Sequence, residues 1–64
     1  MFDKKQIAFM QSIGLNLDFD HLKEDDYNKI EDAVAEKLQI SGFDKEYNVT
    51  ETGKMCESIL DQLS

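Results

Sequence analysis

Apolar residues recur at helical spacing in three stretches of the chain. In the first stretch, Phe9, Met10 and Ile13 fall on one side of a 3.6-residue period. Gly14 follows them and can take the left-handed conformation that ends many helices. This pattern predicts a helix over about 3–14.

The second stretch has the clearest helical pattern. Three acidic residues, 24 to 26, stand where a helix would begin, which suits the partial positive charge of a helix N-terminus. Apolar positions then repeat at spacings of three, four and four, at Tyr27, Ile30, Val34 and Leu38. Because Gly42 interrupts the pattern, it predicts a helix over about 24–41.

A third helix is predicted over about 51–63. Thr50 is a candidate N-cap, with Asn48 as the alternative. The apolar stripe consists of Met55, Cys56, Ile59, Leu60 and Leu63. Gly53, in the first turn, is expected to weaken the helix by up to about 1 kcal/mol relative to alanine.

Between the first two helices, apolar and polar residues alternate. Leu15, Leu17 and Phe19 point the same way in an extended chain, yet no second strand is evident to pair with it. We expect an ordered extended linker whose apolar side chains plug the core, with a helical turn over 20–22. Because isolated short helices are marginal in water, the three must pack together. The predicted fold is all-α, one compact three-helix domain spanning 1–64. Its predicted core is Phe9, Ile13, Leu17, Ile30, Val34, Leu38, Ile59, Leu60 and Leu63.

Composition and charge limit the classes of partner that the chain can bind. Fourteen acidic residues against seven basic ones give the 64-residue chain a net charge of -7. This charge repels nucleic-acid phosphate and anionic membranes and suits a partner protein with a basic surface. A lone cysteine, Cys56, cannot form an internal disulfide, and no membrane-spanning run or signal peptide is evident. We therefore expect a cytoplasmic protein that binds neither nucleic acid nor membrane directly.

No combination of residues indicates an enzyme, a metal site or a cofactor. Acidic residues surround His21, but when the calcium-loop pattern starts at Asp18, its glycine position holds Lys23 and its final glutamate position holds Lys29. His21 and Cys56 are a conceivable base and nucleophile, yet Cys56 lies on an apolar stripe, where a thiol usually packs in the core. We predict a non-enzymatic protein.

Two surfaces remain as candidates for binding a partner. The first is a row of acidic residues on the second helix, which either imitates nucleic-acid phosphate toward a basic protein or is only a solvated face. Its residues are Glu24, Asp25, Glu31, Asp32 and Glu36. The second is aromatic: Phe43 and Tyr47 lie in a connection, where they either cap the core or anchor a partner. Capping is favoured because so small a domain needs every aromatic side chain.

Two functional hypotheses follow. The chain is an interaction or regulatory protein that binds another protein through the acidic face of the second helix. Alternatively, it is a structural module that forms a homodimer through Phe43, Tyr47 and the third helix.

The C-terminal half also resembles a group of known sequences. The likeness rests on Gly42-Phe43-Asp44, Tyr47, Thr50-Glu51, Gly53-Lys54-Met55-Cys56-Glu57, Asp61 and Leu63, and more loosely on Phe9-Met10 and Ile13-Gly14-Leu15. On these residues the chain resembles small acidic uncharacterised proteins encoded by phages, prophages and other mobile elements of Gram-positive bacteria. This resemblance implies a biological context and no activity.

Overall fold

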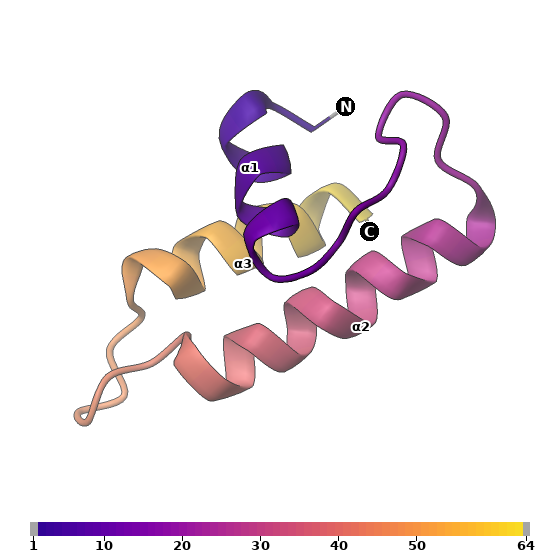
Figure 1. Cartoon of the computed structure of the whole chain (residues 1–64). Coiled ribbons are helices and arrows are strands. Elements are labelled where there is room, and N and C mark those ends of the chain that lie inside the picture. The colour runs from indigo at the N-terminus through magenta and orange to yellow at the C-terminus, as the bar shows by residue number, and fades with distance from the viewer. Residues whose placement is uncertain (1, 64) are drawn as a thin grey trace.

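The computed structural model describes residues 2–63, which form three helices joined by two ordered connections (Figure 1). The helices are α1 (Lys4–Ser12), α2 (Glu24–Ser41) and α3 (Glu51–Leu63). The predicted all-α three-helix fold is confirmed. α2 and α3 have the predicted bounds, and α1 begins and ends slightly inside those predicted for it.

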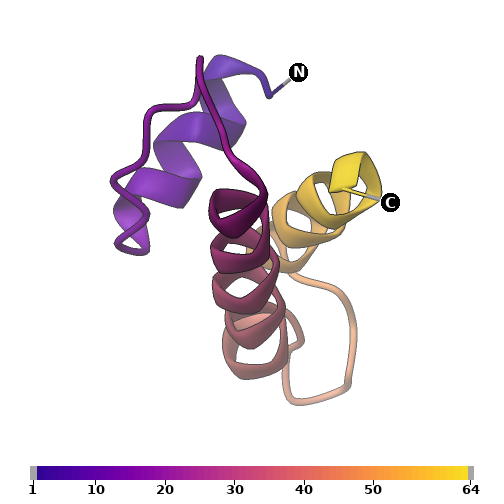
Figure 2. The same ribbon diagram turned by 90° about the vertical axis from the view of Figure 1, so that its right-hand side faces the viewer.

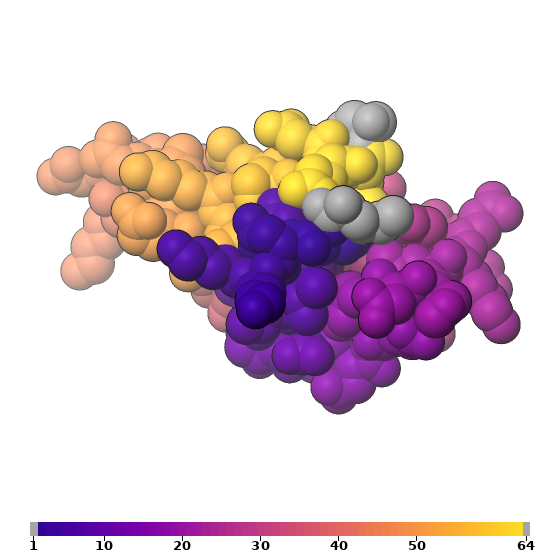
Figure 3. All heavy atoms as spheres, turned by 90° about the horizontal axis from the view of Figure 1, so that it is seen from above, coloured from indigo at the N-terminus to yellow at the C-terminus, as the bar shows by residue number. Residues whose placement is uncertain are grey.

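α2 and α3 form an antiparallel pair that lies side by side over most of its length (Figures 1 and 2). α1 packs mainly against the C-terminal half of α3, and together with the following linker it covers one face of the pair (Figures 2 and 3). The molecule is elongated, with principal extents of 39 × 21 × 20 Å. The connection between α2 and α3 lies at one end of the long axis of the molecule.

Local hydrogen bonds define the ends of α1. The Asp3 carboxylate accepts from the backbone N–H of Gln6 at 2.7 Å, and the Gln6 side-chain oxygen accepts from the Asp3 N–H at 3.0 Å. This reciprocal pair is a capping box. At the other end, Gly14 has the predicted left-handed conformation, with φ 96°. The chain therefore turns sharply there and runs back as the linker.

The linker is extended and its apolar side chains face the core, as predicted. Leu15 is buried, and Leu17, Phe19 and Leu22 are half-buried against the core. The helical turn expected over 20–22 is absent from this segment. A single hydrogen-bonded turn forms instead, in which the His21 N–H donates to the Asp18 carbonyl at 3.1 Å.

The core is centred where all three helices and the linker meet. Its buried members are Met10, Leu15, Ile30, Val34, Cys56 and Ile59. Three of these, Ile30, Val34 and Ile59, were predicted core residues. The other predicted residues are half-buried around this centre: Phe9, Ile13, Leu17, Leu38, Leu60 and Leu63. Met10 takes the central position on α1, because neighbouring residues on a helix point about 100° apart and only one can face inward.

Thr50 and Gly53 make the contacts that hold the end of α2 against the start of α3. The Thr50 hydroxyl accepts from the Gly53 N–H at 3.0 Å and donates to the Ser41 carbonyl at 2.9 Å. Thr50 is therefore the N-cap. Gly53 is buried against the end of α2, and a Cβ at this position would overlap the carbonyl oxygen of Gly42. Glycine is needed at this position because the two backbones touch.

Candidate functional site

The structure does not present Cys56 as a nucleophile. Its side chain is 0% exposed, and this burial raises the pKa of the thiol and so favours its unreactive protonated form. His21 lies on the linker with its ring largely exposed, and its Nδ1 lies 3.2 Å from the Asp18 carboxylate. A thiol closed off from solvent cannot reach a substrate, so Cys56 acts as a packing residue.

The five acidic residues predicted on α2 are all exposed, and we call them the acidic face (Glu24, Asp25, Glu31, Asp32 and Glu36). At 100° per residue, Asp25, Asp32 and Glu36 lie on the side of α2 opposite Ile30 and Val34. Within residues 2–63, His21 Nδ1 contacts Asp18 and an ion pair joins Lys54 to Glu51. The acidic face takes part in neither, so its negative charge is available to a partner.

Phe43 and Tyr47 do not cap the core, contrary to the favoured expectation. Phe43 is 44% exposed and Tyr47 is 85% exposed, and both lie in the connection that projects from one end of the molecule (Figures 1 and 3). An antiparallel bridge between Phe43 and Val49 makes this connection a short hairpin that turns away from the helices. We call its exposed apolar residues the hairpin patch (Phe43, Tyr47 and Val49).

Hydrogen bonds hold the hairpin turn in a defined shape. One Asp44 carboxylate oxygen accepts from the backbone N–H of Asn48 at 2.9 Å and of Glu46 at 2.8 Å. These bonds, with that from Asn48 the stronger cause, lower the pKa of Asp44 because they stabilise its ionised form. Tyr47 has φ 64°, a left-handed conformation that costs energy for an aromatic residue. The turn thus presents an exposed tyrosine ring on an ordered backbone.

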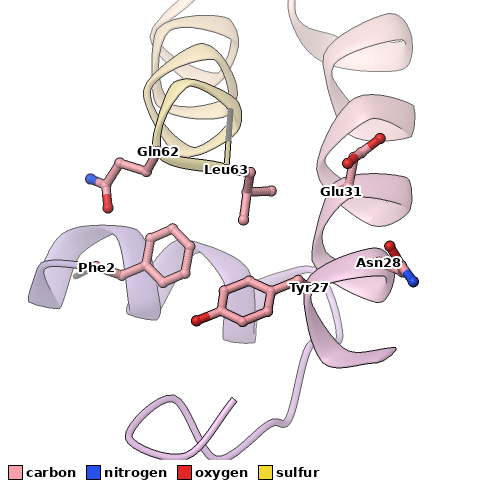
Figure 4. Close-up of a pocket in the computed structure, with 6 residues that line it drawn as sticks. All are labelled: Phe2, Tyr27, Asn28, Glu31, Gln62 and Leu63. Atoms are coloured by element: carbon pink, nitrogen blue, oxygen red, sulfur yellow. The ribbon is translucent and has the colours of Figure 1, made fainter. Parts of the chain in front are cut away.

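A groove of about 650 Å³ opens where Phe2 meets the first turns of α2 and the last turn of α3 (Figure 4). Its lining combines apolar side chains with polar ones: Phe2, Tyr27, Asn28, Glu31, Gln62 and Leu63. Of these, only Glu31 was predicted as a site residue. Sequence reasoning missed the groove because its walls come from three segments that no local pattern connects.

The orientation of Gln62 in this groove is set by its neighbours. The Gln6 side-chain oxygen already accepts from the Asp3 backbone N–H at 3.0 Å, which identifies that atom as an acceptor. The contact of 2.9 Å between the same oxygen and Gln62 must therefore use the Gln62 amide nitrogen. The Gln62 carbonyl oxygen is consequently turned away from Gln6 and toward Phe2 at the groove (Figure 4).

Comparisons with known proteins add no relative: no family model, curated protein or solved structure matches the chain. Within residues 2–63, none of the helices combines the length and the apolar character needed to cross a bilayer.

Proposed function

We propose that the chain is a non-enzymatic interaction or regulatory protein that binds a basic partner protein through the acidic face of α2. The observation that carries this proposal is the acidic face itself, whose carboxylates are exposed and take no part in the contacts of His21 and Lys54 with acidic residues. The net charge of -7 adds a long-range field of the same sign. Such a field speeds encounter with a positively charged surface and selects against other partners.

The class of basic partner that fits best is a nucleic-acid-binding protein. The acidic face runs from Glu24 to Glu36, or about 18 Å at the 1.5 Å rise of a helix. A protein that binds nucleic acid carries lysine and arginine residues placed to meet closely spaced phosphates. A helix with carboxylates along one side offers these residues a substitute for the phosphates.

The test compares two charge-reversed variants of the tagged chain. Asp32→Lys with Glu36→Lys alters the acidic face, and Glu57→Lys with Asp61→Lys alters exposed residues of α3. Each replacement changes the charge by two units, so both double variants shift the net charge equally. The proteins are incubated with a Gram-positive bacterial lysate, the host that the sequence resemblance implies, with and without nuclease, and eluted with stepped salt.

We expect a basic protein that the unaltered chain and the α3 variant retain and the α2 variant loses, independently of nuclease. Elution at moderate salt would agree with the screening of exposed charges. Equal retention by the two double variants would contradict a role for the acidic face. Loss of retention only after nuclease treatment would show that nucleic acid bridges the two proteins.

A second candidate function is self-association, which the hairpin patch favours. Phe43 and Tyr47 are 44% and 85% exposed, and exposed apolar side chains on one short segment are typical of an interface. A homodimer through this patch should show twice the monomer mass by sedimentation equilibrium at high micromolar concentration, and Phe43→Ser with Tyr47→Ser should abolish it. A monomer mass for the unaltered chain under these conditions would exclude the dimer.

A further inference from the structure

We infer that the groove between Phe2, α2 and α3 binds an arginine side chain of the basic partner. This inference rests on the proposed function and specifies one contact within it. The groove adjoins the acidic face, because Glu31 belongs to both. A partner that lies along α2 would therefore bring its side chains to the mouth of the groove.

The walls of the groove suit the long apolar stem and the flat head of arginine. Phe2 and Tyr27 point their rings toward each other beneath Leu63 (Figure 4). Methylene groups of a long cationic side chain pack on such apolar surface while the charged head stays near water. A guanidinium also stacks favourably on the face of an aromatic ring.

The polar groups at the rim are hydrogen-bond acceptors. Glu31 supplies a carboxylate from α2, and the Gln62 carbonyl oxygen lies beside Phe2 on the other side of the groove (Figure 4). Arginine carries five N–H donors and no acceptor, so its head can donate to Glu31 while its stem packs on the rings. The pairing adds a charge-assisted hydrogen bond at Glu31.

Other occupants match the groove less well. A purely apolar group would remove water from the Glu31 carboxylate and the Gln62 carbonyl oxygen without replacing their hydrogen bonds. An anion would meet both Glu31 and the net charge of -7. A second copy of this chain carries no arginine and has the same negative charge. Charge and hydrogen-bonding capacity therefore select a cationic donor from another protein.

The test is an NMR titration of the labelled full chain with N-acetyl-arginine methylamide. Saturable shifts are expected in the ring signals of Phe2 and Tyr27 and in the methyl signals of Leu63. The citrulline analogue has nearly the same shape without the charge, and we expect it to give no saturable shift. Glu31→Gln should weaken arginine binding by roughly three- to tenfold, as expected for loss of one charge-assisted bond. The matched control Glu57→Gln, on the outer face of α3, should leave binding unchanged.

Several results would overturn the inference. They are the absence of saturable shifts, equal shifts with citrulline, and arginine binding that Glu31→Gln does not weaken. The same signals moving with protein concentration alone would assign the groove to a second copy.

The variant Asp32→Lys with Glu36→Lys separates this inference from the proposed function, because it leaves all six lining residues unchanged. It should still show saturable arginine shifts while it loses the partner. Arginine binding in the groove together with undiminished partner retention would contradict only the proposed function. If this variant loses the partner and the unaltered chain does not bind arginine, only the inference that the groove binds arginine is contradicted.

Discussion

At the scale of single residues, Gly53 shows how a neighbouring segment can decide which residue a helix carries. In the first turn of α3 a glycine lowers helix stability, and its own helix offers no reason for it. The reason lies just after α2, where the carbonyl group of the C-cap residue Gly42 occupies the space that a Cβ would need. The close contact sets the distance between the two helices at their connected end.

We expect Gly53→Ala to destabilise the protein by about 1–3 kcal/mol, although alanine is the better helix former. The loss arises because the Cβ meets backbone, which cannot rotate away as a flexible side chain can. The free energy of unfolding in urea, measured by circular dichroism, provides the test. Glu57→Ala, at an exposed position of the same helix, controls for helix propensity. Equal or greater stability for Gly53→Ala would show that the helices separate easily.

Some residue positions could be read from the sequence and others could not. Ile30, Val34 and Ile59 are buried as predicted. On the long apolar stripes of α2 and α3, the residues that fit the helical period are also the ones that face the core. On α1, both Phe9 and Met10 fit the period, and only docking on α3 decides that Met10 faces inward. The exposure of Tyr47 depends on the direction of a hairpin, which residue composition does not reveal.

At the scale of elements, α1 is attached differently from the other two helices. α2 and α3 bury a long apolar seam, whereas α1 adds to the apolar contacts of Met10 and its half-buried neighbours a polar network centred on Gln6. Gln6 is only 4% exposed, and its side chain bonds to Asp3, Ser58 and Gln62. One side chain thus caps α1 and fastens it to α3.

Gln6→Ala should therefore loosen α1 selectively. We expect a loss of about 1–3 kcal/mol, since the variant removes the capping bond and both bonds to α3. Hydrogen exchange should accelerate at the amides of α1 and change little in α2 and α3. Gln11→Ala, an exposed glutamine on the same helix, is the matched control. Exchange in α1 that is as slow in Gln6→Ala as in Gln11→Ala would show that apolar packing alone holds this helix.

The elements themselves were predictable, but the groove they form was not. Sequence spacing locates the helix ends well, because helix ends depend on local hydrogen bonds and backbone conformation. The signals are the acidic residues at the start of α2, Thr50 before α3 and Gly14 after α1. The acidic face could be predicted because one helix carries it. The groove needs Phe2, Tyr27 and Leu63 together, and their meeting depends on how the three helices pack.

At the scale of the whole molecule, stability depends on a small shared core. A chain of 64 residues has an expected unfolding free energy of roughly 3–10 kcal/mol. Val34 is 0% exposed and lies in the buried cluster with residues of α1, α3 and the linker. Damage at this point affects every element at once.

Val34→Asp should unfold the protein, because burying an unpaired carboxylate in the core costs about as much free energy as unfolding the whole domain requires. Circular dichroism should show no cooperative thermal transition and a large loss of helix. Gln39→Asp, an exposed position on the same helix, should retain the transition. A native-like transition in Val34→Asp would refute the placement of this residue in the core.

The groove has a practical consequence for handling the protein. Phe2 and Leu63 both line it, so the two chain ends of the described segment meet at the surface proposed to receive the partner. An affinity tag fused to either end would stand beside the groove, so a tagged chain can bind through the acidic face while its groove is obstructed. Because the ends are neighbours, a circular permutant could join them by a short linker and open the chain within the hairpin turn near Lys45. A tag on the new ends would then leave the groove clear, at the opposite end of the elongated molecule.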